Sequence, residues 1–323
     1  DLTYAKVRLD PRSVATMVDA LPQLPSALSR AVLWGIAWNL CRDAEHPAAT
    51  YVQLLLSGLG AESDLHALGA LLAQGWKATN DYSTLAERDR VQAVWNEGVA
   101  GLLAVAEPGS DHQLALAKAL PVATTPAGAN TLAGWRNGEG LPEGLSLDPE
   151  LRWSVVHHLA RLGRLGEAEI AAEQAADPTI TGAEQAAGAR AARPTAEAKV
   201  EAWRLAVETD EIPNATQRAI CRSFWARNQD AVLAPYVERY FAAAEDISAA
   251  RGVWADKGMA LRSNVLGDLF PQPRDLAAFL PRLDAWLEQA ELGDSVRRQV
   301  VERRDDAVRA LRCQQAASPA AAR

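Results

Sequence analysis

The pattern of apolar and polar residues changes once along the chain, close to residue 10. Residues 1–10 alternate, so that one face carries Thr3, Ala5, Val7 and Leu9 and the other carries Leu2, Tyr4, Lys6 and Arg8. This period of two predicts a half-buried β-strand. No second strand is predicted after Pro11. Because a lone strand leaves its backbone N–H and C=O groups unpaired, we expect residues 1–10 to belong to a sheet of a preceding domain in a larger protein.

From Pro11 onwards the apolar residues recur at helical spacing. Three wide stripes predict helices that face a packed core: Leu28, Val32, Leu33, Ile36, Ala37 and Leu40; Leu151, Val155, Leu159 and Leu162; and Leu276, Phe279, Leu280, Leu283, Trp286 and Leu287. Helix starts are indicated by Asp10-Pro11 and Asp148-Pro149, since Asp caps free N–H groups and Pro suits the first helical position. Capping boxes are predicted at Thr181-x-x-Glu184 and Asn214-x-x-Gln217.

The predicted helices pair into hairpins. One spans residues 149–176 and turns at 163–166, the next spans 181–207 and turns at 192–195, and another begins at Asn214. Their starts lie roughly thirty residues apart, which is the range of helical repeats. The predicted fold is therefore all-α, a curved helical-hairpin array of the HEAT or armadillo kind, with one short N-terminal β-strand left from a preceding β-sandwich domain.

Domain boundaries follow from the breaks in this pattern. We expect residues 1–10 to be the residual strand, residues 11–312 the helical domain, and residues 313–323 a disordered tail. Glycine and proline predict an exposed loop at 134–147, between a front and a back half, and a second break at 270–274.

Composition narrows the class of protein. The 323 residues carry a net charge of −8, which argues against a nucleic-acid surface, and no apolar run is long enough to span a bilayer. Three widely spaced cysteines, Cys41, Cys221 and Cys313, favour a reducing cytoplasm. We expect Cys41 and Cys221 to be buried apolar residues.

No catalytic motif is present in the sequence. Adjacent helical residues point about 100° apart, so His157 and His158 cannot chelate one ion from a regular helix. We expect one of them to be hydrogen-bonded and partly buried and the other to face solvent. Trp34 and Trp38, four apart, are expected in the core. Lys257 and Arg262 lie between helical stripes and are candidates to face a groove.

A family resemblance rests on the order of several segments. Residues 2–10 resemble the segment that joins the β-sandwich of M1-family zinc aminopeptidases to their C-terminal helical domain. Further similar segments are 29–34, 38–43, 147–153, 162–169, 192–199, Ala202-Trp203 and 233–240. Together they cover almost the whole chain, which is identified as resembling that C-terminal helical domain.

The resemblance implies a function without catalytic residues in this chain. The family's Gly-x-Met-Glu-Asn and His-Glu-x-x-His motifs are absent here, so no catalytic, metal or binding residue is assigned. Zinc is expected in the missing catalytic domain. The expected partners are that domain, the β-sandwich and a peptide substrate, whose access the helical domain would restrict by capping the active site.

Three other interpretations stay open from the sequence. The chain could be a free-standing helical-repeat scaffold that binds a peptide or protein in its groove, or a helical enzyme with an unrecognised site. Exposure of the N-terminal strand would also favour a dimer through that edge.

Overall fold

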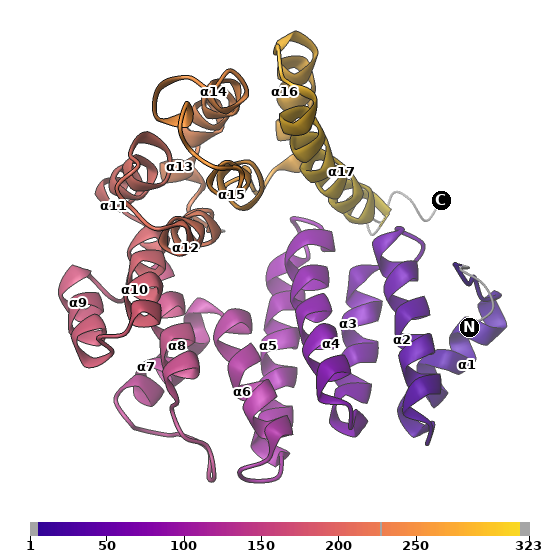
Figure 1. Cartoon of the computed structure of the whole chain (residues 1–323). Helices are drawn as coiled ribbons and strands as arrows, with labels where there is room; N and C mark the ends of the chain where they lie inside the picture. Colours follow the sequence, from indigo (N-terminus) through magenta and orange to yellow (C-terminus); the bar gives the residue numbers. More distant parts are fainter. Residues whose placement is uncertain (1–5, 227, 317–323) are drawn as a thin grey trace. The chain divides into compact units, whose positions relative to one another are not determined.

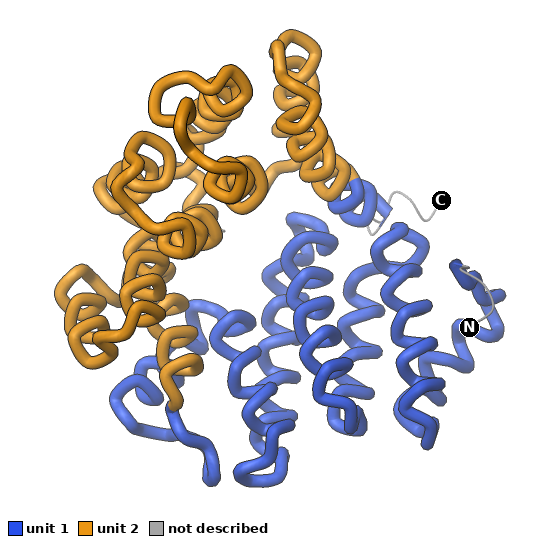
Figure 2. The backbone as a smooth tube through the Cα atoms, viewed as in Figure 1, with its two compact units in different colours: residues 1–147, 309–323 blue, residues 148–308 orange. Residues whose placement is uncertain are grey.

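The computed structural model describes residues 6–226 and 228–316 (Figure 1). These residues form two compact units: the first contains the described residues up to and including Leu147 and those from Arg309 onwards, and the second runs from Asp148 to Val308 (Figure 2). All regular structure in the described ranges is helical, which confirms the all-α hairpin array. In the same ranges, no helix is both long and apolar enough to pass through a bilayer.

The first unit is built from helices in two layers. Its elements are α1 (Pro11–Ala20), η1 (Leu21–Gln23), α2 (Ala27–Arg42), α3 (Ala48–Gly58), η2 (Leu59–Ala61), α4 (Leu65–Lys77), η3 (Ala78–Tyr82), α5 (Arg88–Val105), α6 (Asp111–Ala123), η4 (Pro126–Gly128) and α7 (Ala129–Arg136). Helices α2, α4 and α6 contact one another in sequence, and α3 contacts α5, so alternate helices share a layer (Figure 1).

The second unit is also built from helices. Its elements are α8 (Pro149–Arg161), α9 (Glu167–Ala176), α10 (Ile180–Ala192), α11 (Ala196–Trp203), η5 (Arg204–Glu208), α12 (Asn214–Phe224), α13 (Asp230–Leu233), α14 (Tyr236–Ser248), η6 (Gly252–Trp254), α15 (Met259–Ser263), η7 (Asn264–Asp268), α16 (Leu276–Gln289) and α17 (Asp294–Ala316), whose last residues belong to the first unit. The predicted hairpins at 149–176 and 181–207 are confirmed as α8–α9 and α10–α11.

Helix α10 packs unusually closely against its neighbours because its buried face is made of glycine and alanine. A Cβ atom added at Gly188 would lie 2.7 Å from the His157 ring and 3.2 Å from the Ala219 carbonyl oxygen. Contacts below 3.0 Å require the neighbours to move. Gly188 therefore sets the distance between α8, α10 and α12, which form one layer of the unit.

The C-termini of these three helices share their capping groups. The Lys199 ammonium donates hydrogen bonds of 2.7 Å to the carbonyls of Ala191 and Phe224, in the last turns of α10 and α12. The Gln229 amide donates to the carbonyls of Arg161 and Ala192, at the ends of α8 and α10. Helix C-termini carry unsatisfied carbonyls and partial negative charge, so a buried ammonium and amide stabilise all three ends together.

Helix α2 buries a different face from the one that its apolar pattern predicts. Leu28 and Val32 are 77% and 53% exposed, whereas Arg30 and Trp34 are buried. The Arg30 guanidinium pairs with the buried Glu62 carboxylate at 3.0 Å, and the Trp34 indole donates to the same carboxylate at 3.2 Å. The prediction that Leu28 and Val32 face the core is therefore wrong. The ion pair with Glu62 turns Arg30 toward the interior of the unit instead.

Both ends of the chain correct the prediction. Residues 1–5 of the predicted strand lie outside the described residues, and residues 6–10 form no strand, because no second strand pairs with them in the described chain. The predicted tail begins too early, since α17 continues to Ala316 and Cys313 is buried with its thiol 3.4 Å from the Cys41 carbonyl. Residues 317–323 lie outside the described residues.

Two of the predicted helix starts are confirmed. Asp10 and Asp148 cap α1 and α8 as predicted, and Gly163 has a φ of 71° beyond the end of α8. The predicted box at Thr181 is wrong, because Thr179 caps α10. The box at Asn214 is also wrong: its side-chain oxygen accepts a 2.7 Å hydrogen bond from Asn264, so it joins α12 to η7 instead.

The shared cap predicts a pH dependence of stability. Burial lowers the pKa of Lys199 to about 7. Between this value and the ordinary lysine pKa, the unfolded chain binds a proton that the folded chain does not, so folding becomes more favourable as pH rises through that window. We expect the stability advantage of the wild type over Lys199→Met, measured by urea denaturation, to be larger at pH 9.5 than at pH 7, growing by up to about 1 kcal/mol per pH unit. An advantage that stays constant or shrinks would contradict this.

A second prediction concerns the buried ion pair. Burial raises the pKa of Glu62, but the hydrogen bonds from Arg30, the Asp64 amide and Trp34 outweigh it and hold the pKa below its ordinary value. This stabilisation is present above the ordinary glutamate pKa and is lost as pH falls through the lowered value. Glu62→Gln leaves Arg30 without its counter-charge, and we expect a loss of about 3–5 kcal/mol in the free energy of unfolding at pH 7. Glu97→Gln, on the surface of α5, is the control and should change stability little.

Candidate functional site

The adjacent histidines of α8 have separate structural roles. His157 is half-buried and its Nε2 lies 2.9 Å from the Gln185 side chain, which confirms the hydrogen-bonded member of the pair. The prediction that the other faces solvent is wrong, since His158 is 4% exposed and its Nδ1 lies 2.8 Å from the Arg161 guanidinium. Burial lowers the pKa of His157 to about 4 and of His158 to about 3, so both are neutral at pH 7.

Trp34 and Trp38 belong to the packing of the first unit. Trp34 is buried beside Glu62, as predicted for a core residue. Trp38 is half-buried and packs against Tyr51 and Tyr82, with ring centroids 5.4 and 5.6 Å away. The three cysteines are likewise buried free thiols, which confirms the prediction for Cys41 and Cys221.

Lys257 and Arg262 line a pocket of about 320 Å³ but direct their charged groups to backbone carbonyls. The Lys257 ammonium donates to the Thr209 carbonyl, and the Arg262 guanidinium donates to the carbonyls of Lys257 and Trp254. These bonds hold the segment between α14 and α15 in place. The structure thus brings the two residues together, but the charged group of each is already hydrogen-bonded to backbone carbonyls.

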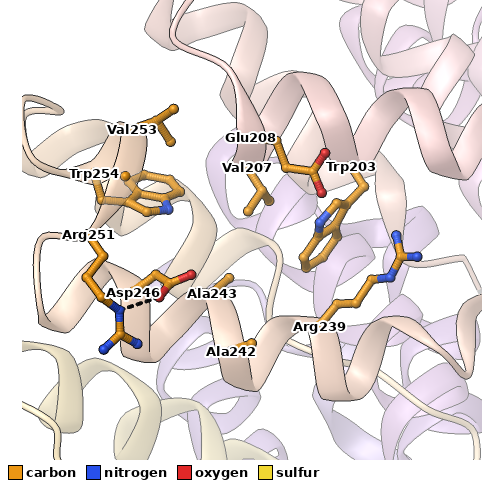
Figure 3. A pocket seen from close by; sticks show the side chains of 11 residues that line it. Trp203, Val207, Glu208, Arg239, Ala242, Ala243, Asp246, Arg251, Val253 and Trp254 are labelled. Atoms are coloured by element: carbon orange, nitrogen blue, oxygen red, sulfur yellow. Dashed lines mark hydrogen bonds and ion pairs between the residues drawn. The ribbon is translucent and has the colours of Figure 1, made fainter.

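A larger pocket of about 390 Å³ lies between η5, α14 and η6, and the sequence did not reveal it (Figure 3). Its walls include the indoles of Trp203 and Trp254, and its apolar lining is made of Val207, Ala242, Ala243 and Val253. Four charged residues complete the lining: Glu208, Arg239, Asp246 and Arg251. Arg251 and Asp246 neutralise each other through an ion pair of 2.7 Å.

The two indoles are almost fully buried. Trp203 and Trp254 are each 3% exposed. Within the described residues, neither indole N–H donates a hydrogen bond. Neither nitrogen is among the fully buried polar atoms that lack a hydrogen-bond partner. In Figure 3 the two indoles lie on opposite sides of the pocket, with Val207 drawn between them and Glu208 next to Trp203.

Other side chains pack against these two indoles. Trp203 packs against Phe224 and Tyr236, with centroid distances of 5.9 and 5.3 Å. The Lys257 ammonium lies 4.3 Å from the Trp254 ring centroid. These contacts hold both indoles in the walls of the pocket.

The described residues do not fit a zinc centre. No group of three histidine, cysteine, aspartate or glutamate side chains in those ranges is placed to hold a metal ion. His157 and His158 could serve as zinc ligands by residue type. Their ring nitrogens lie beside Gln185 and Arg161 instead. No reaction step through zinc is therefore derived for this chain.

Comparison with known proteins identifies the family. Residues 1–309 match the model of the ERAP1-like C-terminal domain. The chain is also 42% identical over 322 residues to an aminopeptidase N from Streptomyces lividans, and the match covers 99% of this chain but 37% of that relative. The chain thus spans little more than a third of the curated relative that it matches. It belongs to the ERAP1-like C-terminal domain family, and its resemblance to the C-terminal domain of M1-family aminopeptidases is confirmed.

Proposed function

We propose that the chain is the non-catalytic C-terminal domain of a zinc aminopeptidase of the M1 family. The observation that carries the proposal is the match of nearly the whole chain to a limited part of an aminopeptidase N. The sequence lacks the His-Glu-x-x-His motif, which assigns the zinc and the peptidase chemistry to the remainder of the parent chain. Three buried free thiols support the cytoplasmic location that their spacing favours.

We further propose that this domain covers the active site of the parent and restricts which peptides reach it. The support is physical: stacked helical hairpins form a stiff wall that can enclose a cavity without supplying reactive groups. The common cap on α8, α10 and α12 gives the second unit this stiffness.

An exposed apolar face of α2 supports docking onto the rest of the parent. Leu28 and Val32 lie four residues apart and therefore on the same side of the helix, and both are exposed in this chain. Exposed aliphatic residues gain free energy when they are covered, at about 25 cal/mol per Å².

The first test uses the chain by itself. We expect the purified protein to bind less than one equivalent of zinc by atomic emission and to leave aminoacyl arylamides uncleaved. A chelator should not shift its melting temperature, because no folding free energy depends on a metal. Zinc-dependent turnover that copurifies with the chain and is lost on chelation would refute the non-catalytic assignment.

The second test uses the parent with and without residues 11–316. If the domain restricts access, its removal should raise kcat/KM for a long unstructured polypeptide relative to that for an aminoacyl arylamide, by about tenfold or more. Zinc content and circular dichroism establish that the shortened parent is folded. Adding the separate domain back should restore discrimination. An unchanged ratio in a folded, zinc-loaded parent would exclude the capping role.

A further inference from the structure

The end of α17 belongs to a different unit from the rest of the helix. Residues 294–308 are part of the second unit, whereas residues 309–316 are part of the first, as their colour in Figure 2 shows. The chain therefore passes between the units twice, once after Leu147, in the stretch 137–148 between α7 and α8, and once inside the unbroken helix α17. Contact of the end of α17 with the first unit gives the two units a second connection.

The end of α17 contacts the first unit through backbone carbonyls at the ends of two other elements. The Cys313 thiol lies 3.4 Å from the Cys41 carbonyl and 3.5 Å from the Arg42 carbonyl, in the last turn of α2. The Gln314 amide donates a 2.7 Å hydrogen bond to the Asp81 carbonyl, near the end of η3. Helix C-termini leave carbonyls without intrahelical donors, so these two side chains add donors where the backbone supplies few.

These contacts are weak compared with those that hold the body of the helix. A thiol is a weak donor, and the buried side chains of Ala310 and Cys313, which are 5% and 4% exposed, are small. In the body of α17, by contrast, Arg304 donates two hydrogen bonds to the Asp284 carboxylate, and Arg297 donates to two carbonyls at the end of α16. Hydrogen bonds from a charged group are stronger than neutral ones, so the end of α17 is held less firmly than its body.

We propose that the end of α17 is an intramolecular latch that opens without unfolding of either unit. In the closed latch, residues 309–316 lie on α2 and η3. In the open latch, Cys313 meets solvent, and the stretch 137–148 alone joins the two units. Segments that bury few apolar side chains open at a lower free energy than the whole protein unfolds. The inference concerns the chain itself and does not depend on the activity of a parent enzyme.

Cys313 is a built-in reporter of the latch. Burial raises the pKa of its thiol, and a buried, protonated thiol is unreactive, so alkylation at neutral pH requires the latch to open. Cys221 is a fully buried thiol of α12 in the second unit, and it reacts only when that unit opens. The ratio of the two rates therefore separates latch opening from unfolding.

Alkylation of the intact folded chain with iodoacetamide, followed by mass spectrometry, tests the proposal. Each rate is divided by that of the same cysteine in the denatured chain. We expect Cys313 to react at least tenfold faster than Cys221, because a local opening costs less than unfolding. Gln314→Ala should speed the reaction of Cys313 by about fivefold, the effect of one neutral hydrogen bond, and leave the rate of Cys221 unchanged.

Gln315→Ala is the matched control. Gln315 is the next residue of the same helix and its side chain is exposed, so its replacement should change neither rate. Equal rates for Cys313 and Cys221 in the wild type would mean that only unfolding releases the end of α17, and would overturn the proposal. A Gln314→Ala variant in which Cys313 keeps its wild-type rate, or in which Cys221 is accelerated equally, would also overturn it.

Discussion

The second unit depends on the capping of three helix C-termini at one point. Lys199 and Gln229 between them satisfy four carbonyls at the ends of α8, α10 and α12. Without these donors, three sets of buried carbonyls would lie together in a region of low dielectric, which costs free energy for each unsatisfied group. The alanine and glycine face of α10 brings the helix ends close enough for one side chain to reach two of them.

The same arrangement positions the pocket. Phe224 supplies its carbonyl to Lys199 and its ring to Trp203, so the residue at the end of α12 connects the cap to the pocket wall. On the opposite wall, Lys257 covers one side of Trp254 while donating to the Thr209 carbonyl. Lys199 thus acts on Trp203 through Phe224, whereas Lys257 contacts Trp254 directly.

Family and function rest on different kinds of observation. The family follows from a match along the chain, whereas the role of a domain without catalytic motifs is a matter of shape and surface. Buried polar pairs such as Arg30 with Glu62 specify how each helix is rotated, and they decide which apolar residues remain exposed for a partner.

The sequence by itself determined the helical class, the α8–α9 and α10–α11 hairpins, the caps at Asp10 and Asp148, and the family, because these depend on local periodicity and on the order of segments. Tertiary structure decided the rest. It turned Arg30 and Trp34 inward on α2, buried His158, and drew Asn214 from a cap into a contact with Asn264. It also brought Trp203 and Trp254, fifty-one residues apart in the printed sequence, to one pocket. Long-range hydrogen bonds and ion pairs outweigh local preferences at these positions, and no periodic pattern records which distant residue will provide the partner.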